Sequence, residues 1–235
     1  MNSTRLPGKV LLPACGKPLL AHQIERLQRV PSLDAIVVAT TVNSIDEPIV
    51  ELARMLGVGC FRGSEEDVLS RVLGAAQAYD ADVIVEITGD CPAIDPDIVQ
   101  HCIDKYFVTG ADYVSNTLKR TYPGGMNVQV FSTKILAEVE YTTRGDMVAR
   151  EHVSLPIYEH PERYNLYNVE APPELSRPDI VIEVDVPADY DMIKAIFESL
   201  YPVNPEFGLT EILAFLDAHH EVEDLNKNAR RQTAR

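Results

Sequence analysis

Residues 82–92, Asp-Val-Ile-Val-Glu-Ile-Thr-Gly-Asp-Cys-Pro, join an apolar run to a tight turn that carries an acidic residue. The run from Asp82 to Thr88 is rich in β-branched residues and predicts a buried strand. A helix is expected from Pro96 to Phe107, because proline suits the first position of a helix. An earlier apolar run, Ala35 to Thr40, is separated from this unit by helical patterns. The alternation predicts an α/β fold with a mostly parallel sheet covered by helices.

The rest of the chain is divided by the same reasoning, although its second half is less regular. Helical patterns are expected at residues 18–30, 43–57, 64–79, 133–141, 148–158, 188–200 and 209–219. Further strands are expected at residues 58–61, 112–116, 126–132, 164–170 and 180–184. We expect one domain over residues 1–220. Residues 221–235 have few apolar side chains and are expected to form a flexible tail.

The composition excludes several classes of protein. The chain has 235 residues and a formal net charge of −15, which argues against general nucleic-acid binding, because such proteins present a basic surface. No apolar run reaches the roughly 18 residues needed to cross a membrane, and no export leader is seen. The four cysteines lack metal-site spacing, so we expect reduced thiols in a cytoplasmic protein.

The amino end reads Met-Asn-Ser-Thr-Arg-Leu-Pro-Gly-Lys and has the composition of a phosphate-binding loop. Ser3 and Thr4 are small hydroxyl residues, Arg5 offers a planar fork of donors and Lys9 a point charge. The spacing from glycine to lysine is not that of a Walker A loop. Taken alone, the segment is equally well explained as a proline-glycine turn with solvated cations.

Two acidic residues follow apolar runs and are candidates for metal ligands. Asp90 lies in the turn after the strand of residues 82–88, and Asp185 follows the apolar residues 180–184. Ligands of open α/β sheets bind beyond the carboxyl ends of strands, and Mg²⁺ usually takes one or two protein carboxylates. The alternative is that Asp90 only caps its turn. Asp189 and Asp191 are expected to cap the helix that follows.

Five motifs in order resemble one family, the cytidylyltransferases of spore-coat polysaccharide biosynthesis, which are related to the synthetases of CMP-activated acidic sugars. The motifs are S-T-R-L-P-G-K-V-L at residues 3–11, G-S-E-E-D-V-L-x-R at 63–71, I-T-G-D-C-P-x-I-D-P at 87–96, R-E-H-V at 150–153 and V-D-x-P-x-D at 184–189. The resemblance spans nearly the whole chain. It implies a Rossmann-like nucleotide-diphospho-sugar transferase fold, CTP as donor and Mg²⁺ as cofactor.

The resemblance also assigns roles at the nucleotide end of the expected site. It implies that Ser3, Thr4, Arg5 and Lys9 bind the nucleotide, and that Arg5 and Lys9 act in catalysis by stabilising the departing pyrophosphate. Asp90 and Asp185, as candidate metal ligands, would hold Mg²⁺.

At the other end, Arg71 and the backbone near Thr40 would line the nucleoside pocket. The matching R-E-H motif suggests that Arg150, Glu151 and His152 face the acceptor. For His152, a role in packing the second half of the chain is an equally good explanation.

The sequence departs from the family pattern at four places. Family members usually carry a strand just before the position of Met1, so we expect a start site assigned too late, with a degenerate copy as the alternative. Glu86 stands where arginine is common, and Asn127 and Gln129 stand where carboxylates are usual. These amides reduce the negative charge, so we expect an altered acceptor or a reduced activity.

The function expected from these observations is transfer of CMP from CTP to a sugar or related polysaccharide precursor, with release of pyrophosphate. One alternative is a glycosyltransferase that consumes a nucleotide sugar, although the D-x-D motif usual after a strand is replaced here by Asp-Cys-Pro. Another is a catalytically impaired nucleotide-binding homologue. The expected partners are CTP and a sugar-like acceptor. A homodimer is left open, because the second half could provide the surface.

Overall fold

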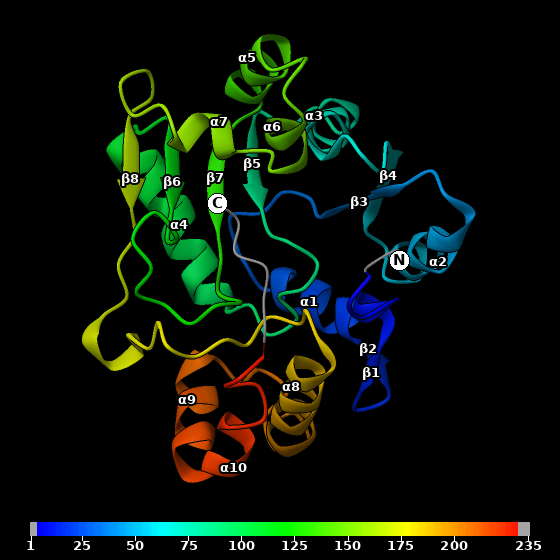
Figure 1. Ribbon diagram of the computed structural model, residues 1–235, viewed down its shortest axis with the longest axis vertical. Helices are drawn as coiled ribbons and strands as arrows, with labels where there is room; N and C mark the ends of the chain where they lie inside the picture. Colours follow the sequence, from blue (N-terminus) through cyan, green and yellow to red (C-terminus); the bar gives the residue numbers. More distant parts are fainter. Residues whose placement is uncertain (1–3, 230–235) are drawn as a thin grey trace.

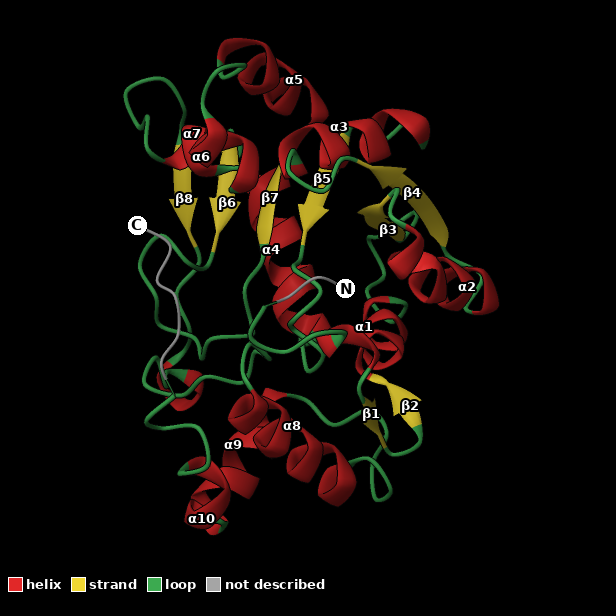
Figure 2. Ribbon diagram, turned by 45° about the vertical axis from the view of Figure 1, so that its right-hand side comes forward, coloured by secondary structure: helices red, strands yellow, loops and turns green. Residues whose placement is uncertain are grey.

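The computed structural model describes residues 4–229 as an α/β fold, shown in Figures 1 and 2. The helices are α1 (Leu19–Leu27), α2 (Glu47–Met55), α3 (Val68–Ala78), α4 (Pro96–Thr109), α5 (Thr133–Thr142), α6 (Met147–Glu151), α7 (Leu155–Tyr158), α8 (Pro187–Leu200), α9 (Leu209–Ala218) and α10 (His220–Glu223). The strands are β1 (Pro13–Ala14), β2 (Lys17–Pro18), β3 (Val37–Thr41), β4 (Gly59–Gly63), β5 (Val83–Glu86), β6 (Tyr113–Ser115), β7 (Gln129–Ser132) and β8 (Leu166–Asn168). Short 3-10 helices are η1 (Lys9–Leu11), η2 (Ser44–Asp46) and η3 (Pro173–Leu175).

The largest sheet has the strand order β5-β7-β6-β8 and is mixed. Strand β7 runs antiparallel to both β5 and β6, whereas β6 and β8 are parallel. The expectation of a mostly parallel sheet is therefore wrong for β7. The connection from β6 to β7 contains no helix, and parallel neighbours need a crossover that usually contains one.

A separate parallel pair, β3–β4, lies beyond β5 (Figure 1). Among residues 4–229, β3 and β5 each pair along one edge only. All four residues of β5 are half-buried, whereas all three residues of β6 are buried. The expectation of a further strand before Met1 stays a prediction.

The segment at residues 180–184, expected as a strand, is extended but forms a bridge rather than a ladder. Its backbone contacts include an isolated bridge between Gly124 and Val181 and a hydrogen bond from the Val184 N–H to the Asp90 carbonyl, 2.8 Å long. Close packing explains the glycine at position 125, where an added Cβ would lie 2.8 Å from the Ile182 carbonyl oxygen. Its φ of 95° also favours glycine.

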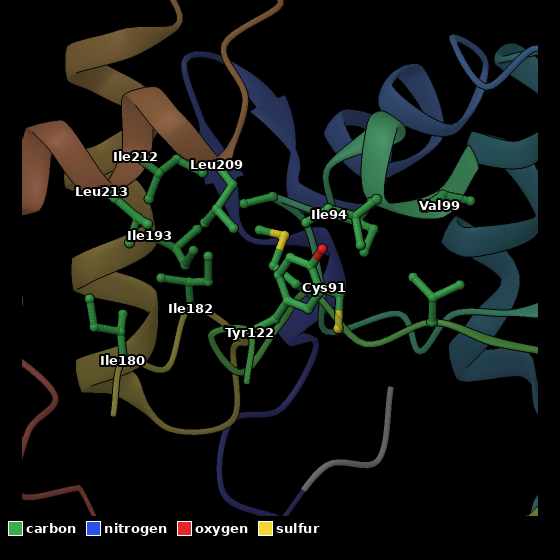
Figure 3. Close-up of a cluster of buried hydrophobic side chains, with 14 of the residues drawn as sticks. Cys91, Ile94, Val99, Tyr122, Ile180, Ile182, Ile193, Leu209, Ile212 and Leu213 are labelled. Atoms are coloured by element: carbon green, nitrogen blue, oxygen red, sulfur yellow. The ribbon is translucent and has the colours of Figure 1, made fainter. Parts of the chain in front are cut away.

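Two apolar cores lie on opposite faces of the large sheet. One is formed with α4, α8 and α9, and includes Cys91, Tyr122 and Ile193 (Figure 3). The other is formed by side chains of α3, α5 and α7, together with Tyr113 and Phe131 of the sheet. Successive residues of β5 alternate between these cores, as the period of a strand requires.

The carboxyl-terminal region packs against the domain as far as the structure describes it. Residues 220–223 form α10, and the buried Asn226 side chain donates 2.8 Å hydrogen bonds to the Val181 carbonyl and to Asp189 Oδ1. These residues belong to the segment expected as a tail, of which 230–235 lie outside the described residues.

Within residues 4–229, no helix is both long enough and apolar enough to cross a membrane. The thiols of Cys15, Cys60, Cys91 and Cys102 are unpaired.

Candidate active site

Lys9 lies between the carboxylates of Asp90 and Asp185, which are far apart in the sequence. Its Nζ is 2.9 Å from Asp90 Oδ2 and 3.0 Å from Asp185 Oδ1. Gly8, with φ of 68°, turns the chain into η1, whose first residue is Lys9. Arg5 reaches the same place, with Nη2 2.5 Å from Asp185 Oδ2. The structure thus brings together Arg5, Lys9, Asp90 and Asp185.

Asp90 is held by the strand that precedes it and by the extended segment beside it. The Thr88 hydroxyl donates a 2.6 Å hydrogen bond to Asp90 Oδ1. The Val184 N–H donates to the Asp90 carbonyl, which fixes the Asp185 segment against the Asp90 turn. Val10 of η1 lies next to Gly89. Three distant stretches of chain therefore meet at this turn.

Asp185 is positioned through Asp189, one of the residues expected to cap a helix. Asp189 is fully buried at the start of α8, and its Oδ2 accepts 3.0 Å hydrogen bonds from the N–H groups of Asp185 and Val186. Its Oδ1 accepts from Asn226, and sequence reasoning gave no signal for that contact. The capping prediction for Asp189 is confirmed, because the backbone donors at a helix start are satisfied by a carboxylate.

The ion pairs favour the charged forms of Asp185 and Lys9. Burial raises the pKa of the Asp185 carboxyl, but hydrogen bonds from Arg5 and Lys9 outweigh it and hold that pKa below its ordinary value. For Lys9, burial lowers the pKa, and the carboxylates of Asp90 and Asp185 outweigh it and raise the pKa above its ordinary value. The cations Arg5 and Lys9 can therefore bind a polyanion, and the carboxylates Asp90 and Asp185 can bind a divalent cation.

The donor set fits a magnesium ion that is shared with a nucleotide. Mg²⁺ binds hard oxygen ligands and usually takes one or two protein carboxylates, with phosphate oxygens and waters completing the shell. Asp90 and Asp185 are two such carboxylates, and both contact the same lysine nitrogen. The part of the chain that the structure describes contains no cluster of three or more metal-binding side chains, so a site enclosed by protein ligands alone does not fit.

The residues predicted for the nucleoside pocket lie together at the β3–β4 pair. Thr40, at the end of β3, donates a 2.8 Å hydrogen bond to Asp46 Oδ2. Arg71 of α3 packs over Gly63 at the end of β4 and donates to the Ser64 carbonyl. Burial lowers the pKa of Arg71, and the charge of Asp46 acts in the opposite direction.

The predicted residues nearest the amino terminus are only partly covered by the structure. Ser3 lies outside the described residues, and Thr4 is exposed. The proposed roles of Ser3 and Thr4 stay predictions.

Arg150 occupies a structural position in addition to its predicted acceptor role. Its guanidinium is buried, pairs with Asp67 at the start of α3, and lies 3.1 Å from a carboxylate oxygen of Glu140 on α5. Glu151 is exposed at the end of α6, and His152 follows it, half-buried. The acceptor roles of these three residues stay predictions. Asp67 is also the N-cap of α3, and the sequence gives no signal for its ion pair with Arg150.

The positions at which the chain departs from the family pattern lie close to one another. Glu86 and Gln129 are direct partners in the β5–β7 ladder, and Asn127 precedes Gln129 by two residues. Asn127 Oδ1 accepts a 3.0 Å hydrogen bond from Arg120, and its amide donates to Glu183 at 3.3 Å.

Two surface hollows of about 340 Å³ each lie away from Lys9 and Asp90. One adjoins α1 and the end of α8, around His22 and Tyr201, and the other adjoins α5, around Lys134 and Glu138. Neither contains a residue predicted for the site. The candidate site is therefore identified by the convergence of charged groups rather than by an enclosed cavity.

Comparison with known proteins gives the family. The profile of the cytidylyltransferase family matches residues 1–223. The chain is 34% identical over 234 residues to an uncharacterised protein of Methanocaldococcus jannaschii, across 100% of this chain and 94% of that protein. It is 31% identical over 221 residues to the spore coat polysaccharide biosynthesis protein SpsF of Bacillus subtilis, across 92% and 90%. The chain belongs to the cytidylyltransferase family, which is a kind of nucleotidyltransferase.

Solved structures agree with this assignment and with the fold. A cytidylyltransferase from Leptospira borgpetersenii superposes with a TM-score of 0.89 at 29% identity, across 99% of this chain and 95% of that one. The CMP:2-keto-3-deoxy-manno-octonic acid synthetase, solved in complex with CTP, gives a TM-score of 0.60 at 18% identity, across 83% and 93%. The predicted nucleotide-diphospho-sugar transferase fold is confirmed.

Proposed function

We propose that the protein transfers CMP from CTP to a sugar-like precursor of a polysaccharide and releases pyrophosphate. The observation that carries the proposal is the contact of one lysine, Lys9, with the two carboxylates Asp90 and Asp185. The family and the name of the Bacillus subtilis relative support the choice of cytidylyl transfer and of a polysaccharide precursor.

The charges of the site match those of a magnesium-bound triphosphate. Arg5 and Lys9 pair with carboxylates in the structure, and phosphate oxygens can take the place of those carboxylates as their partners. Asp90 and Asp185 would then hold Mg²⁺, which supplies Lewis-acid neutralisation of phosphate charge when it is bound. Ser3 and Thr4 would add hydroxyl donors to the same triphosphate.

Catalysis by this chain consists of positioning and charge stabilisation. An acceptor oxygen attacks the α-phosphorus of CTP, the bond to the bridging oxygen breaks, and pyrophosphate leaves. Arg5 and Lys9 stabilise the charge that develops on pyrophosphate. A single preorganised donor of this kind contributes roughly 3–4 kcal/mol to the lowering of the barrier.

The remaining predicted residues would bind the nucleoside of CTP and the acceptor. Thr40 lies near the carboxyl end of β3, and Arg71 packs over Gly63 at the end of β4. The nucleoside would extend from the triphosphate to these two residues. Arg150, Glu151 and His152 would serve the acceptor. Arg150 would act there by holding α3, α5 and α6 together.

The test is acceptor-dependent release of pyrophosphate from CTP and Mg²⁺. The acceptor panel contains sugars, alditols and their phosphates, and each of the other three nucleoside triphosphates replaces CTP in parallel. We expect release that needs CTP, the metal and an acceptor together. Binding of CTP without turnover across the panel would contradict the proposal and support an impaired nucleotide-binding homologue.

A further inference from the structure

Four neighbouring strands present one polar residue each at the same level of the large sheet. The register pairs Glu86 with Gln129, Gln129 with Ser115, and Ser115 with Asn168. Directly paired residues point to the same face of a sheet, so these side chains form a row across it. The face is the one covered by α3 and α5–α7, because Ile84 and Tyr113, two residues earlier on their strands, belong to that core.

The amide of Gln129 is held in one orientation by two hydroxyl groups. Its Oε1 accepts a 2.6 Å hydrogen bond from the Tyr113 hydroxyl and a second hydrogen bond from the Ser154 hydroxyl. Because the carbonyl oxygen accepts both bonds, the two N–H donors of Nε2 point away from these hydroxyls. Gln129 is half-buried, so this donor group remains within reach of a ligand.

Glu86, the neighbour of Gln129, differs from the other buried acids of the protein. Asp46, Asp95 and Asp189 accept hydrogen bonds from backbone N–H groups or side chains. Glu86 Oε2 is buried and has no hydrogen-bond partner among residues 4–229. Burial raises the pKa of Glu86 to about 7, so its carboxyl group is largely neutral below that pH. The side chain keeps part of its surface, which a ligand can contact.

This pair lies on the path that leads from the metal-binding carboxylates along β5. Thr88 follows two residues after Glu86, the last residue of β5, and its hydroxyl donates a hydrogen bond to Asp90. At about 3.3 Å per residue, Glu86 is at most roughly 13 Å from Asp90. The far end of an acceptor whose reacting oxygen lies near Asp90 would therefore be directed along β5 toward Glu86 and Gln129.

We propose that Glu86 and Gln129 bind the far end of the acceptor and select one that carries neutral hydroxyl groups there, rather than a carboxylate. Gln129 Nε2 donates to an acceptor oxygen, and the Glu86 carboxyl group exchanges hydrogen bonds with a neighbouring hydroxyl. Among residues 4–229 no cation pairs with Glu86. An acceptor carboxylate would therefore either repel the ionised Glu86 carboxyl group or have to share a proton with it, whereas a hydroxyl group avoids both costs. The inference rests on the proposed function, since it concerns the acceptor of that reaction.

The experiment compares acceptors that differ in a single group at C6. Glucose, glucuronate and 6-amino-6-deoxyglucose, each as the free sugar and as the 1-phosphate, are tested in pyrophosphate release with CTP and Mg²⁺. Their binding to the CTP-loaded protein is measured in parallel by saturation-transfer NMR. We expect the hydroxyl-bearing member to exceed the carboxylate by at least about tenfold in kcat/KM or in affinity, the effect of one unpaired buried group.

Variants at Glu86 distinguish an effect on the choice of acceptor from a general loss of activity. Glu86→Gln keeps the shape of the side chain and should bring the ratio of neutral to acidic acceptor down several-fold. Glu86→Arg should reverse that ratio in favour of glucuronate. Glu159→Arg, at an exposed position after α7, is the matched control and should leave the ratio unchanged. Melting temperature and CTP binding show whether each variant is folded.

Several outcomes would overturn the inference. Equal use of the hydroxyl and carboxylate members by the wild-type protein would do so, as would preference for the amine, or an unchanged ratio in Glu86→Gln. Binding of CTP without binding of any member also overturns it, while the proposed function stands. Absence of CTP binding instead overturns the proposed function and the inference with it, so the two failures give different results.

Discussion

Two groups of side chains near the carboxyl end of β5 differ in whether their acids are paired with cations. The first group is Asp90 and Asp185, and the second is Glu86 with its neighbour Gln129. Asp90 and Asp185 lie against Arg5 and Lys9, so each acid has a cation. Glu86, four residues before Asp90, is partly buried, and the described part of the chain places no cation against it. The comparison indicates that the first group is arranged for a charged ligand and the second for an uncharged one. Local pairing, rather than the net charge of −15, decides what each region can bind.

The largest effect is expected from removing the shared cation of the first group. Lys9→Ala should lower the rate of CTP-dependent pyrophosphate release a few hundred-fold, because a donor to the leaving group is lost, at a cost of roughly 3–4 kcal/mol. Steady-state kinetics measure the rate, and circular dichroism verifies folding. Lys17→Ala is the control, since Lys17 pairs with Glu25 outside the site. Wild-type turnover by Lys9→Ala would remove Lys9 from the mechanism.

The metal requirement provides the next test of the same group. Asp185→Asn keeps the size of the side chain and removes a charged oxygen ligand, so the Mg²⁺ concentration for half-maximal activity should rise at least about tenfold. Titration of activity with Mg²⁺ at saturating CTP measures this shift. Asp191→Asn, at an exposed position on α8, should titrate like the wild type. An identical Mg²⁺ profile for both variants would contradict the assignment of Asp185.

The second group is tested by the dependence of stability on pH. The folded-state pKa of Glu86 is raised from 4.5 to about 7, so the folded protein binds this proton more tightly than the unfolded chain does. The contribution of Glu86 to the free energy of unfolding is fully present below about pH 4.5 and is lost as the pH rises to about 7. Because the side chain keeps some surface, we expect a loss of about 2 kcal/mol.

Glu86→Gln should remove that loss, so the variant should be the more stable protein above pH 7. Urea unfolding between pH 4.5 and 8 measures the free energy of unfolding of both proteins. Glu159→Gln should follow the wild-type curve, because that side chain is exposed. Parallel curves for wild type and Glu86→Gln would show that Glu86 titrates normally.

The smallest effect is expected at the residue that joins the two groups. Thr88→Val removes the 2.6 Å hydrogen bond to Asp90 Oδ1 and should lower activity about fivefold, which corresponds to about 1 kcal/mol. Thr88→Ser retains a hydroxyl and should recover most of the rate. An equal loss in both variants would indicate that the methyl group, rather than the hydrogen bond, matters.

Much of the fold follows from local patterns of the sequence. The strand at residues 82–88 and the helix from Pro96 were predicted close to their observed bounds, because their periodicity and caps are local signals. The direction of β7 was missed, although the Tyr122-Pro123-Gly124-Gly125 turn lies in its connection to β6. A connection without a helix favours an antiparallel pair, and this local signal outweighs the overall alternation of strands and helices.

The candidate site was predicted in its residues but not in its contacts. Arg5, Lys9, Asp90 and Asp185 were chosen from motifs, and they do meet. The role of Asn226 in fixing Asp189 had no signal, because it depends on a return of the chain from a segment expected to be flexible. The ion pairs of Arg150 were equally hidden, since Asp67 lies 83 residues away.

By itself the sequence determined the alternation of strands and helices, the family, and the identity of the charged residues at three distant motifs. These depend on local periodicity and on residue type, which a sequence states directly. The tertiary structure alone decided which charges are paired. Lys9 contacts two carboxylates, and Glu86 contacts no cation within residues 4–229, because pairing depends on the register of strands and on segments that come together only after folding.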